Sequence, residues 1–242
     1  MGNRIKKNRI WELDALRGIA ILGVLCVHVL FDLRYLFGVR IDVPVWFDFV
    51  QKYGGILFVL ISGVCVTLGS HPIKRGAVVF GAGMAVTLVT FTMEKIDPVS
   101  FSGLLITFGV LHLLGVAMMT YPLYKKLPFW TVALIGAVIV VLGYIINTKR
   151  ASFPLCEAVG IPYAGYTAGD WFPLCPYLGW FMVGTALGKT LYKNKRSLLP
   201  FVPENFFVIR FLRFCGRQSL WIYLVHQPLV YGILYLLFMI IK

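Results

Sequence analysis

Long apolar runs separated by short polar segments make up most of the chain. A helix needs roughly 20 mostly apolar residues to cross a bilayer core of about 30 Å, and seven runs approach that length. The pattern therefore predicts an all-α polytopic membrane protein with about seven transmembrane helices. No internal repeat or low-complexity segment divides the chain, which favours a single domain over residues 1–242. The predicted spans cover residues 11–31, 49–69, 76–93, 103–121, 129–146, 171–191 and 219–241.

Composition agrees with this pattern. Apolar and aromatic residues make up 59% of the 242 residues, and only 14% are charged. A soluble domain is nearer about 45–50% apolar and about 25% charged. The difference excludes a cytosolic enzyme, a disordered chain and a free nucleic-acid-binding protein.

The basic residues predict the orientation of the chain in the membrane. There are 23 Lys and Arg against 10 Asp and Glu, and basic residues gather at the cytoplasmic ends of membrane helices. With a cytoplasmic N-terminus, 15 of the 23 fall on the cytoplasmic side. We predict a multi-pass plasma-membrane protein with an extracytoplasmic C-terminus and no nucleic-acid partner. The cytoplasmic set is Arg4, Lys6, Lys7, Arg9, Lys74, Arg75, Lys125, Lys126, Lys189, Lys193, Lys195, Arg196, Arg210, Arg213 and Arg217.

Residues 199–214 mix two prolines, alternating apolar residues and the basic Arg210 and Arg213. This mixture is typical of a helix that lies on the membrane surface, here on the cytoplasmic face. Its basic residues also suit anionic lipid headgroups.

Four ionisable residues of the first span form one polar stripe: Asp14, Arg17, His28 and Asp32. Each costs about 2.5–3.5 kcal/mol on insertion, which makes it a functional candidate. Asp14 and Arg17 are three residues apart and can pair. His28 follows Arg17 by eleven residues, or about 16 Å along the same helix face. Asp32 is one turn further and could fix the tautomer of His28. The structural alternatives are a salt bridge, a core histidine and an ordinary helix-end carboxylate.

Two more histidines, His112 and His226, lie at mid-membrane depth. Together with His28 they suit a proton-handling cavity or the axial ligands of a b-type haem. A core histidine bonded to a neighbouring carbonyl is the structural alternative for each. No Cys and His spacing suggests a metal site, so no metal is predicted. Cys156 and Cys175 fall on the predicted outer side, where either a disulfide or two unpaired thiols are allowed.

The first span also carries a recognisable motif. The segment 12–22 followed by His28 resembles the opening helix of the transmembrane acyltransferase superfamily, and the spacing from Arg17 to His28 is that of bacterial membrane O-acyltransferases that modify surface polysaccharides. Three other stretches look closer to small bacterial proteins with a heparan-α-glucosaminide N-acetyltransferase catalytic-type domain. These stretches are 57–63, 108–115 and 220–228.

The resemblance implies an enzyme that takes an acyl group, typically acetyl, from cytoplasmic acyl-CoA to an acceptor on the other side of the membrane. A sugar or another cell-envelope component is the expected acceptor. In the O-acyltransferase branch, Arg17 would be associated with acyl-CoA and His28 with catalysis. The human-type enzyme looks to have its histidine in the following loop, and this sequence has none between Phe31 and Ser70. The role of His28 therefore comes from the O-acyltransferase branch.

The chemistry of the residues themselves also fits such an enzyme. His28 is the candidate general base, or the site of a covalent acyl intermediate, and Asp32 is its candidate catalytic partner. A basic cytoplasmic mouth suits the CoA phosphates. The candidate substrate-binding residues are Arg17, Asp14, Lys74, Arg75, His112, Arg213, Arg217 and His226.

Two other functions use the same residues. A transporter or flippase for a small solute or lipid-linked group would use the polar stripe as its pathway. A haem-binding electron carrier is the third hypothesis. The expected partners are acyl-CoA, an acceptor and the lipid bilayer, and the sequence leaves a homo-oligomer open.

Overall fold

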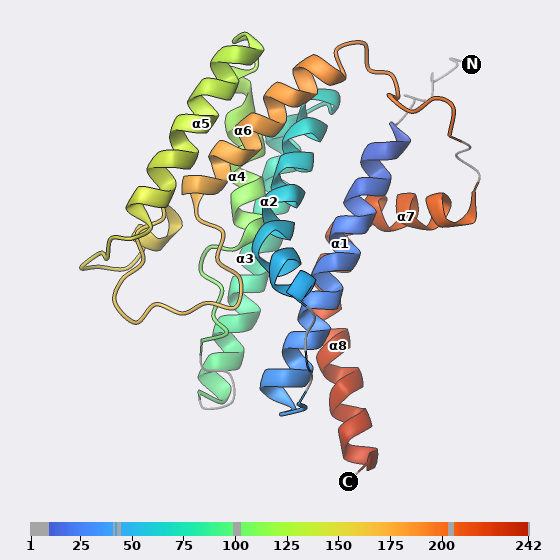
Figure 1. Ribbon diagram of the computed structural model, residues 1–242. Coiled ribbons are helices and arrows are strands. Elements are labelled where there is room, and N and C mark those ends of the chain that lie inside the picture. Colours follow the sequence, from blue (N-terminus) through green and yellow to red (C-terminus); the bar gives the residue numbers. More distant parts are fainter. Residues whose placement is uncertain (1–9, 41, 43–44, 99–102, 203–205, 242) are drawn as a thin grey trace. The chain divides into compact units, whose positions relative to one another are not determined.

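A computed structural model describes residues 10–40, 42, 45–98, 103–202 and 206–241. The regular elements in these ranges are helices (Figure 1), with one isolated β-bridge between Ala151 and Tyr163. The all-α prediction is thereby confirmed. Four basic residues used to predict the orientation lie outside the described residues: Arg4, Lys6, Lys7 and Arg9. Residues 203–205 of the predicted surface helix also lie outside them.

Every predicted span overlaps a helix. Five of these helices are long and apolar enough to cross a membrane, which confirms a polytopic membrane protein. The helix in the fourth span has 15 residues and is shorter than that, and the helix in the sixth span is not among the five. Seven spans therefore stay a prediction. The helices in the spans are α1 (Trp11–Phe31), α2 (Val45–Leu68), α3 (Pro72–Ile96), α4 (Val110–Tyr124), α5 (Phe129–Ile146), α6 (Leu174–Leu191) and α8 (Ser219–Ile241).

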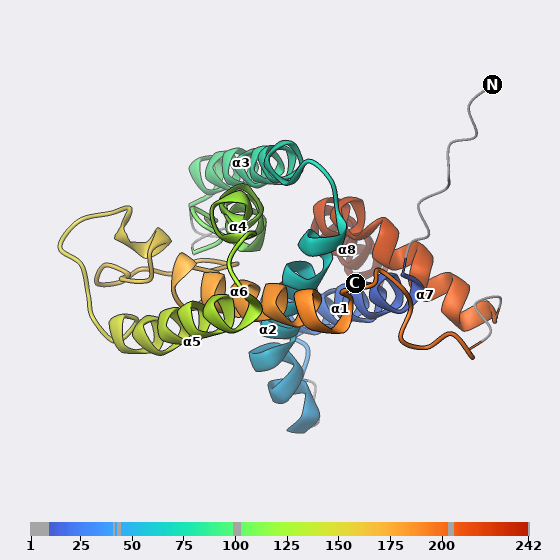
Figure 2. The same cartoon turned by 90° about the horizontal axis from the view of Figure 1, so that it is seen from above.

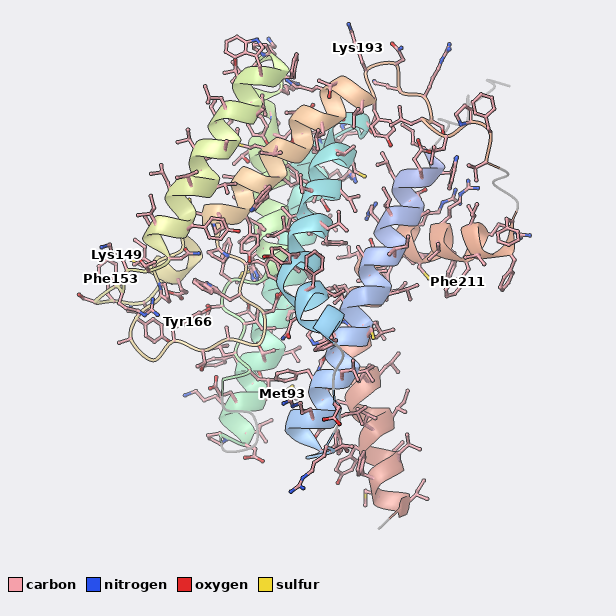
Figure 3. All side chains as sticks on the ribbon, in the orientation of Figure 1. Met93, Lys149, Phe153, Tyr166, Lys193 and Phe211 are labelled. Atoms are coloured by element: carbon pink, nitrogen blue, oxygen red, sulfur yellow. The ribbon has the colours of Figure 1, made fainter. Side chains whose placement is uncertain are left out.

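Three shorter elements complete the described structure. A π-helical turn, η1 (Asp32–Leu36), continues α1, and a short 3₁₀ turn, η2 (Cys156–Ala158), lies in the loop before α6. The amphipathic α7 (Phe207–Arg217) begins later than the predicted surface helix and ends just before α8. It exposes Phe207, Phe211 and Phe214 on one stripe, and Figure 3 labels Phe211 on it.

The chain divides into two compact units, of which the first runs to Phe58 and resumes at Tyr192. In this unit α7 crosses α1, and α8 follows the second half of α1 (Figure 1). Glycines allow the crossing, because a Cβ at Gly18 would overlap the Leu212 carbonyl and one at Gly216 would overlap that of Asp14. The two backbones therefore touch directly, and the polar stripe of α1 faces α7 and α8.

The second unit, Val59–Leu191, contains two tight helix pairs, α3 with α4 and α5 with α6 (Figure 2). Small residues permit the close approach in each pair. Gly136 on α5 and Gly179 on α6 each lie against the other's backbone. Between α3 and α4, Gly76 lies against the Gly115 backbone, and Gly115 lies against Phe80.

Candidate functional site

The polar residues of α1 meet polar residues of α8 inside the first unit. Three residues come from α1 and η1 (Arg17, His28 and Asp32), and three come from α8 (Ser219, His226 and Gln227). We call these six residues the α1–α8 cluster. Three of its polar side chains are deeply buried: Asp32 is 0% exposed, Ser219 3% and His226 7%.

The N-terminal end of the stripe is held by partners from far along the chain. The Asp14 carboxylate accepts from Arg217 Nε at 3.2 Å, and Arg17 Nη2 donates to Ser219 Oγ at 2.7 Å. Asp14 therefore pairs with Arg217 and not with Arg17, because the contact of Gly216 with the Asp14 backbone brings the end of α7 to that carboxylate. Arg17 Nε stays buried without a partner among the described residues.

A third acidic residue of α1, Glu12, is also buried and bonded. Its carboxylate accepts from Ser197 Oγ at 2.9 Å and from the Leu198 N–H at 2.7 Å. This ties the segment before α7 to the first turn of α1. Sequence analysis did not predict this role of Glu12, which it treats only as part of the motif in 12–22.

The two histidines of the cluster lie against one another. The ring centroids of His28 and His226 are 4.8 Å apart, with an interplanar angle of 61°. His226 Nδ1 is 2.5 Å from the Tyr223 carbonyl oxygen, and because a carbonyl only accepts, this nitrogen carries the proton. His226 Nε2 is buried and has no hydrogen-bond partner among the described residues. The ring nitrogens of His28 also have no hydrogen-bond partner among the described residues.

Asp32 does not use its carboxylate for His28. Both oxygens accept from Gln227 Nε2, each at 3.1 Å, which favours the alternative of a helix-end carboxylate over a hydrogen bond to His28. Gln227 follows His226 on α8, and its amide reaches the carboxylate one turn beyond His28. Gln227 Oε1 is buried and unpartnered within the described ranges. Sequence analysis missed Gln227, although a polar side chain in an apolar span was the available signal.

His112 belongs to the second unit and uses both ring nitrogens within the chain. Nδ1 accepts from the Gly109 N–H at 3.2 Å, so Nε2 carries the proton and donates to Thr87 Oγ1 at 3.2 Å. Thr87 in turn donates to the Ile106 carbonyl at 2.6 Å. Next to it, Asp170 accepts from the Val110 N–H at 2.9 Å. These contacts fasten the first turn of α4 and favour the structural alternative for His112.

The other predicted residues lie at helix ends. Lys74 and Arg75 are exposed in the first turn of α3. On α7, Arg217 carries the bond to Asp14, and Arg213 is half-buried. Burial raises the pKa of the Cys215 thiol, which packs on the inner face of α7.

Two cysteines lie in the loop after α5 and at the start of α6. Cys156 and Cys175 are both unpaired thiols. Within the described ranges, no group of three or more His, Cys, Asp or Glu side chains could hold a metal ion. In the loop after α5, burial raises the pKa of Tyr166, whose hydroxyl is 3.0 Å from Thr107 Oγ1.

Comparison with known proteins gives one match. The family model described as heparan-alpha-glucosaminide N-acetyltransferase, catalytic, matches residues 9–228. No curated protein and no solved structure matches the chain significantly. The matched range includes the whole α1–α8 cluster and takes in residues of both units.

Proposed function

The chain belongs to the heparan-α-glucosaminide N-acetyltransferase catalytic family, and on that premise we propose how it works as a membrane acetyltransferase. Acetyl-CoA in the cytoplasm is the donor. A hydroxyl or amine of a sugar, or of another cell-envelope component on the extracytoplasmic side, is the acceptor. The observation that carries this proposal is the ring of His28, which has no hydrogen-bond partner within the described residues and lies beside His226. His28 is on the same polar stripe of α1 as Arg17.

His28 is proposed as the general base. The acceptor oxygen or nitrogen forms a bond to the acetyl carbonyl carbon, and the carbon–sulfur bond of acetyl-CoA breaks. The proton of the acceptor passes to His28 and then to the departing CoA thiolate, so the enzyme returns to its starting state. A positioned base contributes roughly 10²- to 10⁴-fold to such a reaction. An acyl-histidine formed on the same ring is the two-step variant.

Arg17 is proposed as the residue that binds the donor. Its Nη2 is held by Ser219, while its buried Nε has a hydrogen still to donate. A buried N–H of a cationic group without a hydrogen-bond acceptor is costly, and an oxygen of acetyl-CoA would accept from it. On α7, Arg213 and Arg217 are the proposed source of the positive charge that the CoA phosphates need.

The two other hypotheses have less support. The His28 and His226 rings touch, so this pair leaves no room for a haem plane between them. A transporter would use the polar stripe as its path, but then the ring of His28, which has no hydrogen-bond partner within the described residues, has no assigned task.

Binding and turnover of acetyl-CoA by the purified full chain test the proposal. Arg17→Ala is expected to weaken acetyl-CoA binding at least about tenfold by calorimetry, the effect of losing one charged hydrogen bond of about 1.5–3 kcal/mol. His28→Ala is expected to keep binding and to lose thiol release, measured with D-glucosamine as the probe acceptor. Arg150→Ala, in the loop after α5, is the matched arginine control. Absence of both binding and thiol release in the unmutated chain overturns the proposal, and solute uptake without turnover points to the transporter.

A further inference from the structure

His226 has a buried ring nitrogen to which the proposed reaction gives no task. Its Nδ1–H is committed to the Tyr223 carbonyl, so Nε2 presents a lone pair. That atom is buried and has no partner among the described residues, and the whole side chain is only 7% exposed. A buried acceptor without a donor is costly. The site is therefore suited to receive a proton or a hydrogen-bond donor.

The His28 ring lies against the ring that carries this nitrogen. The 4.8 Å between the ring centroids brings the two imidazoles into contact. Two positive charges at such a separation repel strongly in surroundings less polar than water. The pair therefore accepts one proton far more readily than two.

The other groups around the pair do not remove this constraint. The nearest carboxylate in the cluster, that of Asp32, has both oxygens on Gln227 Nε2. The Tyr223 ring packs on His226 at 5.3 Å between centroids and brings no ionised group at neutral pH. Arg17 is fixed to Ser219 at the other end of the stripe.

We propose that His28 and His226 hold a single proton between them, with His226 Nε2 as the second acceptor. The chemical use of this pair rests on the proposed acetyl transfer. When the acceptor attacks the acetyl carbonyl and the carbon–sulfur bond breaks, His28 takes the acceptor proton. The neighbouring lone pair of His226 stabilises that cation until the CoA thiolate takes the proton. His226 acts through His28 and is thus a positioning residue.

Titration of the histidine rings tests the pair without any need for turnover. The full chain, labelled with ¹⁵N-histidine and placed in phosphatidylcholine nanodiscs, is followed by NMR as the pH falls. In the unmutated chain, His28 and His226 are expected to take up protons in two separated steps. In His28→Gln and in His226→Gln, the remaining ring is expected to take up its proton in a single step. That step should lie at a higher pH than the second proton uptake of the unmutated chain. The matched control is His71→Gln, an exposed histidine before α3, which should leave both steps in place.

Turnover gives the second readout. His226→Gln is expected to lower kcat for thiol release at least about tenfold, to change the pH profile and to leave KM for acetyl-CoA unchanged. An unchanged titration of the remaining ring in both single variants overturns the pair, even if thiol is released. Coupled titration without thiol release supports the pair and overturns the proposed reaction instead. If His226→Gln does not fold, the titration of His226 in His28→Gln still tests whether the two rings share one proton.

Discussion

The polar side chains of α1 find their partners about 200 positions away in the sequence, on α8 and next to it. Asp32 meets Gln227 across a separation of 195 residues, and Arg17 meets Ser219 across 202. Hydropathy and helical spacing could place Arg17, His28 and Asp32 on one stripe, because those rules act within one helix. They could not name the partners, because which face of α8 meets the stripe is decided by tertiary packing.

The bond between Gln227 and Asp32 makes the first residue-scale prediction. Gln227→Leu leaves a fully buried carboxylate without its donor, and we expect a loss of about 1–3 kcal/mol in the free energy of unfolding. Chemical unfolding in detergent, followed by tryptophan fluorescence, measures it. Asp32→Asn keeps an oxygen for the Gln227 amide and should cost less. The double variant should cost less than the sum of the single variants, since the two side chains interact. Equal losses of unfolding free energy in both single variants would contradict a hydrogen bond from Gln227 to the Asp32 carboxylate.

His112 makes the second prediction, because its two bonds suggest a structural role. His112→Leu removes the acceptor of the Gly109 N–H and the donor to Thr87. We expect it to lower the free energy of unfolding by about 1–3 kcal/mol and to leave acetyl-CoA affinity unchanged in calorimetry. His71→Leu, at an exposed position, should change stability by no more than about 0.5 kcal/mol. Weaker acetyl-CoA binding at unchanged stability would instead place His112 in the substrate site.

At the scale of helices, agreement with the sequence depends on what ends each apolar run. The helices α1 and α5 have the predicted bounds, since a polar segment flanks each run. The helix α4 begins at Val110 and not at residue 103. Residues 103–108 are mostly apolar as well, so hydropathy cannot separate them from a helix. The start is determined instead by the bond from the Val110 N–H to Asp170, which lies 60 residues away.

The contact between α7 and α1 makes the prediction at this scale. A Cβ at Gly216 would overlap the Asp14 carbonyl oxygen, so Gly216→Ala must push the two helices apart. We expect a cost of about 1–3 kcal/mol in the free energy of unfolding, as for an overpacked core, together with loss of the Asp14–Arg217 bond. Gly232→Ala is the matched control, because nothing lies within 4 Å of its added Cβ. If both variants have the stability of the unmutated chain, the two backbones are not in contact.

At the scale of the whole molecule, the number of membrane crossings is the open structural quantity. With 15 residues, α4 is about 22 Å long, against a bilayer core of about 30 Å. If α4 and α6 do not cross, five spans remain, and the N-terminus and C-terminus still lie on opposite sides. The basic residues do not separate the two cases, because each places many Lys and Arg in the cytoplasm. The loop after α5 does separate them.

That loop lies outside the cell with seven spans and inside with five, when the N-terminus is cytoplasmic. Its exposed Lys149 and Phe153 are labelled in Figure 3. We expect Phe153→Cys, in a chain whose five native cysteines are replaced by serine, to react with a membrane-impermeant maleimide on intact cells. Lys95→Cys is outside in both cases and should also react. Lys193→Cys is cytoplasmic in both cases and should react only after permeabilisation. Protection at residues 153 and 193 with labelling at residue 95 would establish five spans, because the loop after α5 then lies inside and α6 does not cross. Labelling at residue 193 with protection at residue 95 would reverse the orientation, and the proposed entry of acetyl-CoA from the cytoplasm would then be wrong.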